Sequence, residues 1–161
     1  MSIKRSNNNG LDETDITYTR LKGETTQTYL LNGVILKSIR TSTRKKEGKV
    51  QRTVLTKEFL EGEPLKAKEQ VFGHKKELLT EVNFIYDLEK KQFTPEQTTK
   101  YTYTDQKVIS EVIIKKGDET IKKKYIHQFD DSDTGNWTKQ IVTPENSYIT
   151  RRIAYYEAEG E

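Results

Sequence analysis

Residues 107–129 read KVISEVIIKKGDETIKKKYIHQF, and this stretch decides the fold. Two sets of side chains alternate in its first half: Val108, Ser110, Val112 and Ile114 in one set, and Ile109, Glu111, Ile113 and Lys115 in the other. In the second half Tyr125, His127 and Phe129 alternate with polar or basic residues such as Lys124 and Gln128. A period of two is typical of β-strands, whose successive side chains point to opposite faces. Because Gly117-Asp118 between the halves is a turn signal, the stretch predicts two antiparallel strands.

The same alternation recurs along the chain between closely spaced turn signals. It holds for Leu78, Thr80, Val82, Phe84 and Tyr86, residue types that suit a pleated, half-buried surface. Asn32-Gly33 is the strongest turn signal, because this pair accepts the positive φ of a type I′ turn. Others fall at Lys22-Gly23, Glu47-Gly48, Glu61-Gly62, Gly73-His74, Asp105-Gln106 and Pro144-Glu145-Asn146. The sequence predicts an all-β fold, an antiparallel meander of about ten strands that forms a curved repeat sheet or a thin sandwich.

The predicted domain organisation is simple. Residues 1–12 are polar and Asn-rich, and we expect them to form a flexible N-terminal tail. Residues 13–161 are expected to form a single antiparallel β domain. Within this domain the segment from Lys90 to Gln97 is the longest candidate loop, with Phe93 available to fix it to the sheet.

Composition limits the core and the classes of function. Of 161 residues, 32% are hydrophobic and 33% are charged, and the mean hydropathy is -0.91, so we expect little buried surface. The chain has no cysteine and so no disulfide or thiolate metal site. No run approaches the roughly 18 apolar residues of a membrane helix, and residues 1–10 lack the apolar middle of a signal peptide. We expect a soluble protein as written, or an envelope or secreted protein if a leader has been removed.

The last third of the chain carries a family resemblance. Tyr125-Ile126-His127-Gln128-Phe129-Asp130 is followed by Gly135-Asn136-Trp137, and then by Arg151-Arg152-Ile153-Ala154-Tyr155-Tyr156. This order resembles the YD repeats of RHS-type proteins, in the variants common among secreted and surface proteins of Bacteroidetes. The resemblance implies an antiparallel β-repeat sheet that contacts protein or carbohydrate, with no catalytic residues. Gly-Asn occurs once only, and the chain is too short for the closed shell of large RHS proteins.

The sequence contains few residues of the types that usually catalyse reactions. The sequence has only two histidines, His74 and His127, so any triad or metal site based on histidine would draw on them. We expect His74 to be exposed in a turn and His127 to be packed and hydrogen-bonded beside Tyr125 and Phe129. Nucleophile-elbow, His-Glu-x-x-His and phosphate-loop motifs are absent from the sequence. We predict no catalytic residue; the alternative is an enzyme that uses carboxylates alone, as glycosidases do.

The acidic loop at residues 130–136, DDSDTGN, offers several oxygen ligands. Asp131, Asp133 and Asn136 are calcium candidates, since calcium prefers oxygen ligands. The spacing departs from an EF-hand, because Gly135 comes too early and no glutamate follows at the right distance. We expect instead an acidic hairpin turn whose aspartates cap backbone amides, and therefore no metal.

Basic clusters lie beside several tyrosines. The clusters are Arg44-Lys45-Lys46, Lys115-Lys116, Lys122-Lys123-Lys124 and Arg151-Arg152. Aromatic stacking next to lysine is how flat β surfaces hold single-stranded nucleic acid. However, 25 acidic residues nearly balance the 28 basic ones, a mixture that keeps exposed sheets soluble. We therefore expect no nucleic-acid partner.

The candidate binding residues are Trp137, Tyr125, His127, Tyr155, Tyr156 and Arg151. Tyrosine and tryptophan supply large contact areas at low entropic cost. Core packing is the alternative role for Trp137. We predict a non-enzymatic protein-interaction or surface-binding module without a cofactor, whose partner is another protein or else a glycan. A toxin-neutralising immunity protein and a structural component of a phage or secretion assembly are the alternatives.

Overall fold

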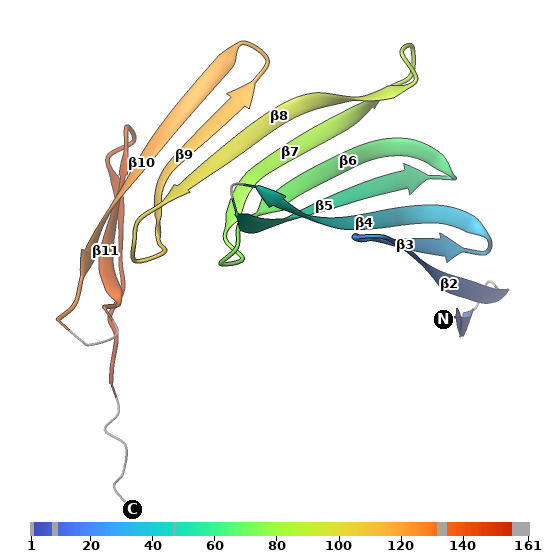
Figure 1. Cartoon of the computed structure of the whole chain (residues 1–161), viewed down its shortest axis with the longest axis horizontal. Coiled ribbons are helices and arrows are strands. Elements are labelled where there is room, and N and C mark those ends of the chain that lie inside the picture. The colour runs from blue at the N-terminus through green and yellow to red at the C-terminus, as the bar shows by residue number, and fades with distance from the viewer. Residues whose placement is uncertain (1, 8–9, 47, 132–134, 156–161) are drawn as a thin grey trace, which may run out of the picture.

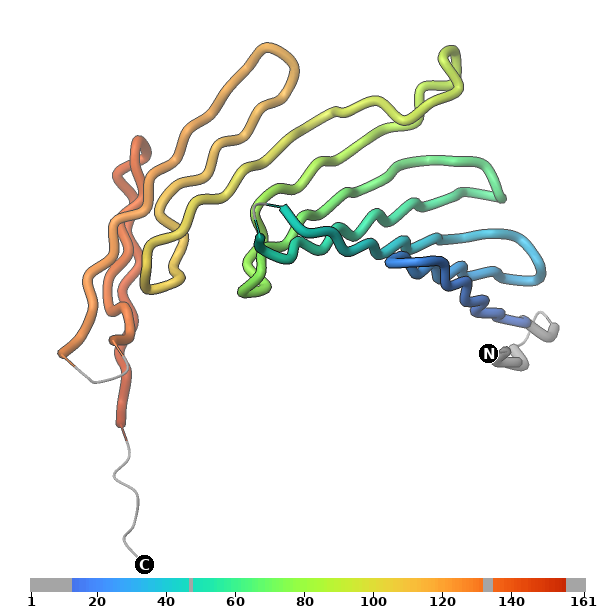
Figure 2. Tube along the Cα trace, in the orientation of Figure 1, coloured from blue at the N-terminus to red at the C-terminus, as the bar shows by residue number. Residues whose placement is uncertain are grey.

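The protein is one open, curved antiparallel sheet without helices in the part of the chain that is described (Figure 1). The structure is a computed structural model that describes residues 2–7, 10–46, 48–131 and 135–155. Strand direction turns progressively from β3 to β11 in Figure 1, as the right-handed twist of β-strands requires. In Figure 2, strands β2 and β11 lie at opposite ends of the molecule, and no second layer covers the sheet between them.

In the described part of the chain, twelve strands follow one another across the sheet in chain order. They are β1 (Ser2–Asn7), β2 (Gly10–Leu21), β3 (Glu24–Leu31), β4 (Val34–Lys46), β5 (Lys49–Leu60), β6 (Glu63–Phe72), β7 (Leu78–Asp87), β8 (Gln92–Tyr103), β9 (Ile109–Lys116), β10 (Glu119–Phe129), β11 (Trp137–Thr143) and β12 (Ser147–Thr150). Every neighbouring pair is antiparallel. The prediction of an all-β meander that forms a curved sheet is confirmed, and the alternative of a thin sandwich is wrong.

The N-terminal tail is a correction to the sequence analysis. Where a flexible tail was predicted for residues 1–12, residues 2–7 form β1 and β2 begins at Gly10. These strands pair in register from Ser2↔Asp15 to Asn7↔Gly10. A polar composition gave no sign of this pairing, because an edge strand is held by backbone hydrogen bonds and needs no apolar side chains.

The predicted loop from Lys90 to Gln97 is also wrong. Strand β8 already begins at Gln92, and the preceding turn is closed by the Asp87 carboxylate, which accepts hydrogen bonds from the backbone N–H groups of Glu89 and Lys90. Pro95 falls inside β8, next to a register shift opposite Asn83/Phe84. A β-bulge is one of the few places where a strand accepts proline, so Pro95 did not mark a loop.

The main turn signals are confirmed. Asn32 and Gly33 both have positive φ, 51° and 80°, as a type I′ hairpin requires. Glu61 and Gly62 show the same pattern, with φ of 52° and 88°. The strand boundaries therefore follow from local turn chemistry.

Strand pairing sorts the side chains onto two faces. Directly paired residues project to the same side of an antiparallel sheet, and successive residues alternate. We call face A the side that carries Glu81, Thr99, Val112, Tyr125 and Val142, and face B the side that carries Val82, Lys100, Ile113, Lys124 and Thr143. Both faces mix apolar and charged residues, which explains the low hydrophobic fraction of the sequence.

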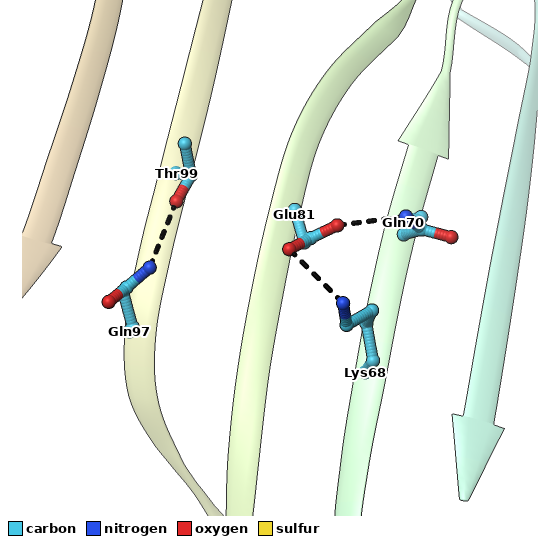
Figure 3. Close-up of polar contacts among 5 residues, drawn as sticks. All are labelled: Lys68, Gln70, Glu81, Gln97 and Thr99. Atoms are coloured by element: carbon cyan, nitrogen blue, oxygen red, sulfur yellow. Dashed lines mark hydrogen bonds and ion pairs between the residues drawn. The ribbon is translucent and has the colours of Figure 1, made fainter.

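Burial is confined to the middle of the sheet. Among the described residues the only buried side chains are Ala67 on β6, Thr99 on β8 and Val112 on β9, each 5–6% exposed. On face A a polar network joins β6 to β7: the Glu81 carboxylate accepts a hydrogen bond from Gln70 Nε2 at 2.8 Å and pairs with Lys68 at 3.4 Å (Figure 3). Lateral neighbours on adjacent strands, and not a second layer, provide the burial.

Candidate binding surface on strands β10 to β12

Strands β10 and β11 bring two of the predicted binding residues onto face A. Tyr125 pairs with Val142, and His127 pairs with Gln140. All four side chains therefore leave the sheet on the same side, with Tyr125 and His127 two positions apart on one strand. Face A at this end of the sheet is a surface of aromatic and amide groups.

Trp137 lies at the centre of an aromatic cluster. A β-bulge at Gln128/Phe129 sets Phe129 opposite Trp137 in the register. The His127 ring lies 5.9 Å from the indole with an interplanar angle of 64°, an edge-to-face arrangement that the ring quadrupoles favour. The Phe129 ring lies 6.2 Å from His127. With Arg151 and Gln140, described next, these three residues form what we call the Trp137 cluster.

Arg151 covers the outer side of the indole. Its guanidinium carbon lies 3.7 Å from the centroid of the Trp137 ring, within the range of a cation–π interaction. Its Nε donates a hydrogen bond to the Trp137 carbonyl at 2.6 Å, and its backbone N–H donates to the Thr138 carbonyl at 2.9 Å. Arg151 makes no ion pair with any residue in the described ranges. Within the described part of the chain, the cluster thus presents a positive charge that no ion pair offsets, stacked on an aromatic ring.

The surroundings of His127 favour the neutral imidazole. Its Nε2 lies 2.8 Å from Gln140 Nε2, and since an amide nitrogen only donates, the imidazole nitrogen accepts in this geometry. Burial, with the nearby charge of Arg151, lowers the pKa of His127. Its Nδ1 is buried without a hydrogen-bond partner among the described residues. The prediction of a packed histidine beside Phe129 agrees with this geometry.

The acidic loop after β10 is closed by its own ends. Asp130 donates its N–H to the Asn136 carbonyl at 2.9 Å, and the Asp130 carboxylate accepts the N–H of Asn136 at 3.0 Å. Tyr155 is held to this closure, because its hydroxyl donates to Asp130 Oδ2 and accepts from Asn136 Nδ2. The pattern matches the expected hairpin turn in which an aspartate caps backbone amides.

Two of the three calcium candidates lie in the described part of this loop. Asn136 takes part in the hydrogen bonds that close the loop, Asp131 is exposed, and Asp133 lies outside the described residues. Within the described ranges no group of three or more acidic or histidine side chains is arranged to hold a metal ion.

Most, but not all, of the predicted residues come together. Trp137, His127 and Arg151 are in contact, Tyr125 lies beside them on face A, and Tyr155 borders the surface through the loop. Tyr156 lies outside the described residues. The sequence analysis missed Gln140, because its contact with His127 depends on the β10–β11 register and no sequence signal marks it.

The lysine cluster of β10 is divided between the faces. Lys123 forms an ion pair with Glu145 on face A, and this hydrogen bond raises the pKa of the lysine and lowers that of the carboxyl. Lys122, on face B, pairs with Glu111 at 2.7 Å. Neighbouring carboxylates therefore offset two of the three charges, as expected for a solvated sheet face.

Comparison with known proteins gives no relative. No protein-family model, no curated protein and no solved structure matches the chain significantly. The resemblance to YD repeats therefore stays a prediction from the residues. Membrane spanning by helices has no support, because none of the described residues lies in a helix of the required length and apolarity.

Proposed function

We propose that this chain is a non-enzymatic protein-interaction module whose partner binds face A over β10 to β12. The Trp137 cluster is the observation that carries the proposal. It combines a half-buried indole, a stacked guanidinium without an ion-pair partner among the described residues, and a histidine with an unsatisfied buried nitrogen. Tryptophan and arginine are the residues that most often dominate the energetics of protein interfaces.

The chemistry of the cluster favours one kind of partner surface. The indole favours an apolar or aromatic side chain, and Arg151 favours a carboxylate beside it. Exposed Ile149 and Tyr155 extend the apolar surface next to the cluster. We therefore expect a protein that presents an acidic residue adjacent to an apolar one. A toxin with such a surface would make this chain an immunity protein, and an envelope protein would make it a surface adaptor.

Site-specific photo-crosslinking tests the proposal. A benzophenone amino acid replaces Tyr125, which is on face A, and in a matched protein it replaces Ile126, the next residue, which is on face B. Incubation with lysate and envelope fraction of the source organism should yield one stoichiometric protein adduct from position 125 and none from position 126. Trp137→Ala should weaken binding of that protein at least about tenfold, and the face B variant Tyr148→Ala should not.

Two outcomes would overturn this function. The first is the absence of any stoichiometric adduct from position 125, and the second is equal capture from both positions. Assembly of identical chains is the second candidate function, because all four residues of edge strand β12 are exposed. Light scattering distinguishes the two, since edge-to-edge assembly would give a concentration-dependent mass without any partner.

A further inference from the structure

A pocket separate from the Trp137 cluster lies between two neighbouring turns, at the ends of the central strands. The first turn joins β6 to β7 over residues 73–77, and the second joins β8 to β9 over residues 104–108. Both project from the lower end of the sheet in Figures 1 and 2. The space between their side chains measures about 460 Å³, the size of a small-molecule site.

The floor of the pocket is apolar and relatively dry. Leu79, Tyr101 and Tyr103 line it, and none of these side chains is exposed by more than about a third of its surface. Tyr103 is fixed because its hydroxyl donates to the Leu78 carbonyl at 2.9 Å. Burial raises the pKa of both tyrosines, so both rings stay neutral at physiological pH.

Glu77 places a carboxylate against this floor. The first turn is closed by hydrogen bonds from Gly73 N–H to the Glu77 carbonyl at 2.8 Å and from Lys76 N–H to the Gly73 carbonyl at 3.1 Å. The Glu77 side chain folds back over Gly73, where any Cβ would collide with its Oε1. Glycine at position 73 therefore allows the carboxylate to occupy this place.

One oxygen of Glu77 has no partner. Its Oε1 lies 3.9 Å from His74 Nδ1, but its Oε2 is buried and makes no hydrogen bond in the described part of the chain. Glu81, on the adjoining strand, is a direct contrast: its side chain is 17% exposed against 22% for Glu77, and both of its oxygens are paired (Figure 3). A buried carboxylate oxygen without a hydrogen bond costs free energy, so binding of a donor that reaches it would be favoured.

The rim of the pocket carries the opposite charge. Lys75, Lys76 and Lys107 line it, and all three are exposed. No ion pair involves them among the described residues. An anion at the rim would therefore be favoured, whereas a cation is favoured only at the deeper Glu77. A ligand that satisfies both must carry both charges around an apolar group.

We propose that this pocket binds a free α-amino acid with an apolar side chain. A rotation of the Glu77 carboxylate turns Oε2 toward the pocket, where it accepts a hydrogen bond from the ammonium group of the ligand. The ligand side chain packs on Leu79 and Tyr101, and the ligand carboxylate faces the lysines of the rim. This arrangement satisfies the buried oxygen and keeps both charges of the ligand near opposite charges. The site is independent of the protein-interaction surface proposed above.

Titration of the whole protein with three related compounds tests the charge pattern. The compounds are L-phenylalanine, phenethylamine, which lacks the carboxylate, and 3-phenylpropionate, which lacks the ammonium group. Chemical-shift changes in two-dimensional NMR report both the affinity and the place of binding. We expect L-phenylalanine to bind at residues 73–79 and 101–107, phenethylamine more weakly, and 3-phenylpropionate at least about tenfold more weakly.

Two variants test the role of Glu77. Glu77→Gln should weaken L-phenylalanine at least about tenfold, because it removes the charge that pairs with the ammonium group. Glu81→Gln, the matched control, should leave the affinity unchanged. If Glu77→Gln does not fold, Gly73→Ala serves instead, since its methyl group displaces the carboxylate. Three outcomes would overturn the proposal. They are equal affinity for the three compounds, no binding of L-phenylalanine at millimolar concentration, and unchanged affinity for L-phenylalanine in Glu77→Gln.

Discussion

The central strands β6 to β9 and the C-terminal strands β10 to β12 differ in how well their buried polar atoms are hydrogen-bonded. In the centre, Glu81 and Thr99 are paired opposite each other and accept hydrogen bonds from Gln70 and Gln97. At the C-terminal end, His127 keeps a buried nitrogen without a partner among the described residues. All residues of β12 are exposed, whereas the three buried side chains lie in the centre.

This difference follows from the single-layer architecture. Without a second layer, a side chain is covered only by its neighbours on adjacent strands, and an edge strand such as β12 has a neighbouring strand on one side only. Stability therefore concentrates in the middle of the sheet, and unsatisfied groups concentrate at its margins. The Trp137 cluster lies near one edge, and Glu77 lies at the ends of the strands. Both proposed sites contain a buried polar atom that has no hydrogen-bond partner among the described residues.

The largest effect on the free energy of unfolding is expected from a pair of side-chain truncations, one in the centre and one on β12. Val112→Ala, in the centre, should lower the free energy of unfolding by about 2 kcal/mol, because it removes two buried methyl groups and leaves space between Tyr101 and Lys123. Ile149→Ala, on β12, should cost less than about 0.5 kcal/mol, since Ile149 is 56% exposed. Urea unfolding followed by tryptophan fluorescence measures both. Equal losses would show that stability is spread evenly over the sheet.

The sequence predicted the strands better than it predicted the sites. Alternation and turn residues are local signals, so the meander and most turns followed from them. The contact of Arg151 with Trp137 spans 14 residues and depends on how β11 and β12 are aligned. The pocket at Glu77 depends on two turns that are about 30 residues apart in the chain and adjacent only in the sheet. Such juxtapositions have no local signature, which is why Gln140 and Glu77 were missed.

A second, smaller contrast compares two carboxylates. Glu81→Gln should destabilise the protein by about 1 to 2 kcal/mol, because it weakens charge-assisted hydrogen bonding to Gln70 and Lys68. Glu77→Gln should be neutral or stabilising in the absence of ligand, since it removes a partly buried charge whose Oε2 has no hydrogen bond among the described residues and whose Oε1 lies 3.9 Å from His74, at the limit of an ion pair. Thermal unfolding in ligand-free buffer compares the two variants directly. A loss at Glu77 as large as that at Glu81 would mean that an intramolecular partner satisfies Glu77.

The smallest expected effect is the pH dependence contributed by His127. Burial and then Arg151 lower its pKa below the usual 6.5, so the folded protein favours the neutral imidazole. Below about pH 6.5 the unfolded chain takes up a proton that the folded chain does not, and stability falls until the pH passes the folded pKa. In His127→Gln this loss should disappear, and in Arg151→Gln it should shrink, because one of the two causes of the shift is removed. Titration of the His127 Cε1 proton by NMR measures the pKa directly. A pKa at or above 6.5 in the native protein would mean that the imidazole is better solvated than its place beside Trp137 implies. His127 would then give no evidence for unsatisfied polar atoms in the C-terminal strands. These strands would differ from the centre of the sheet only in the exposure of their side chains.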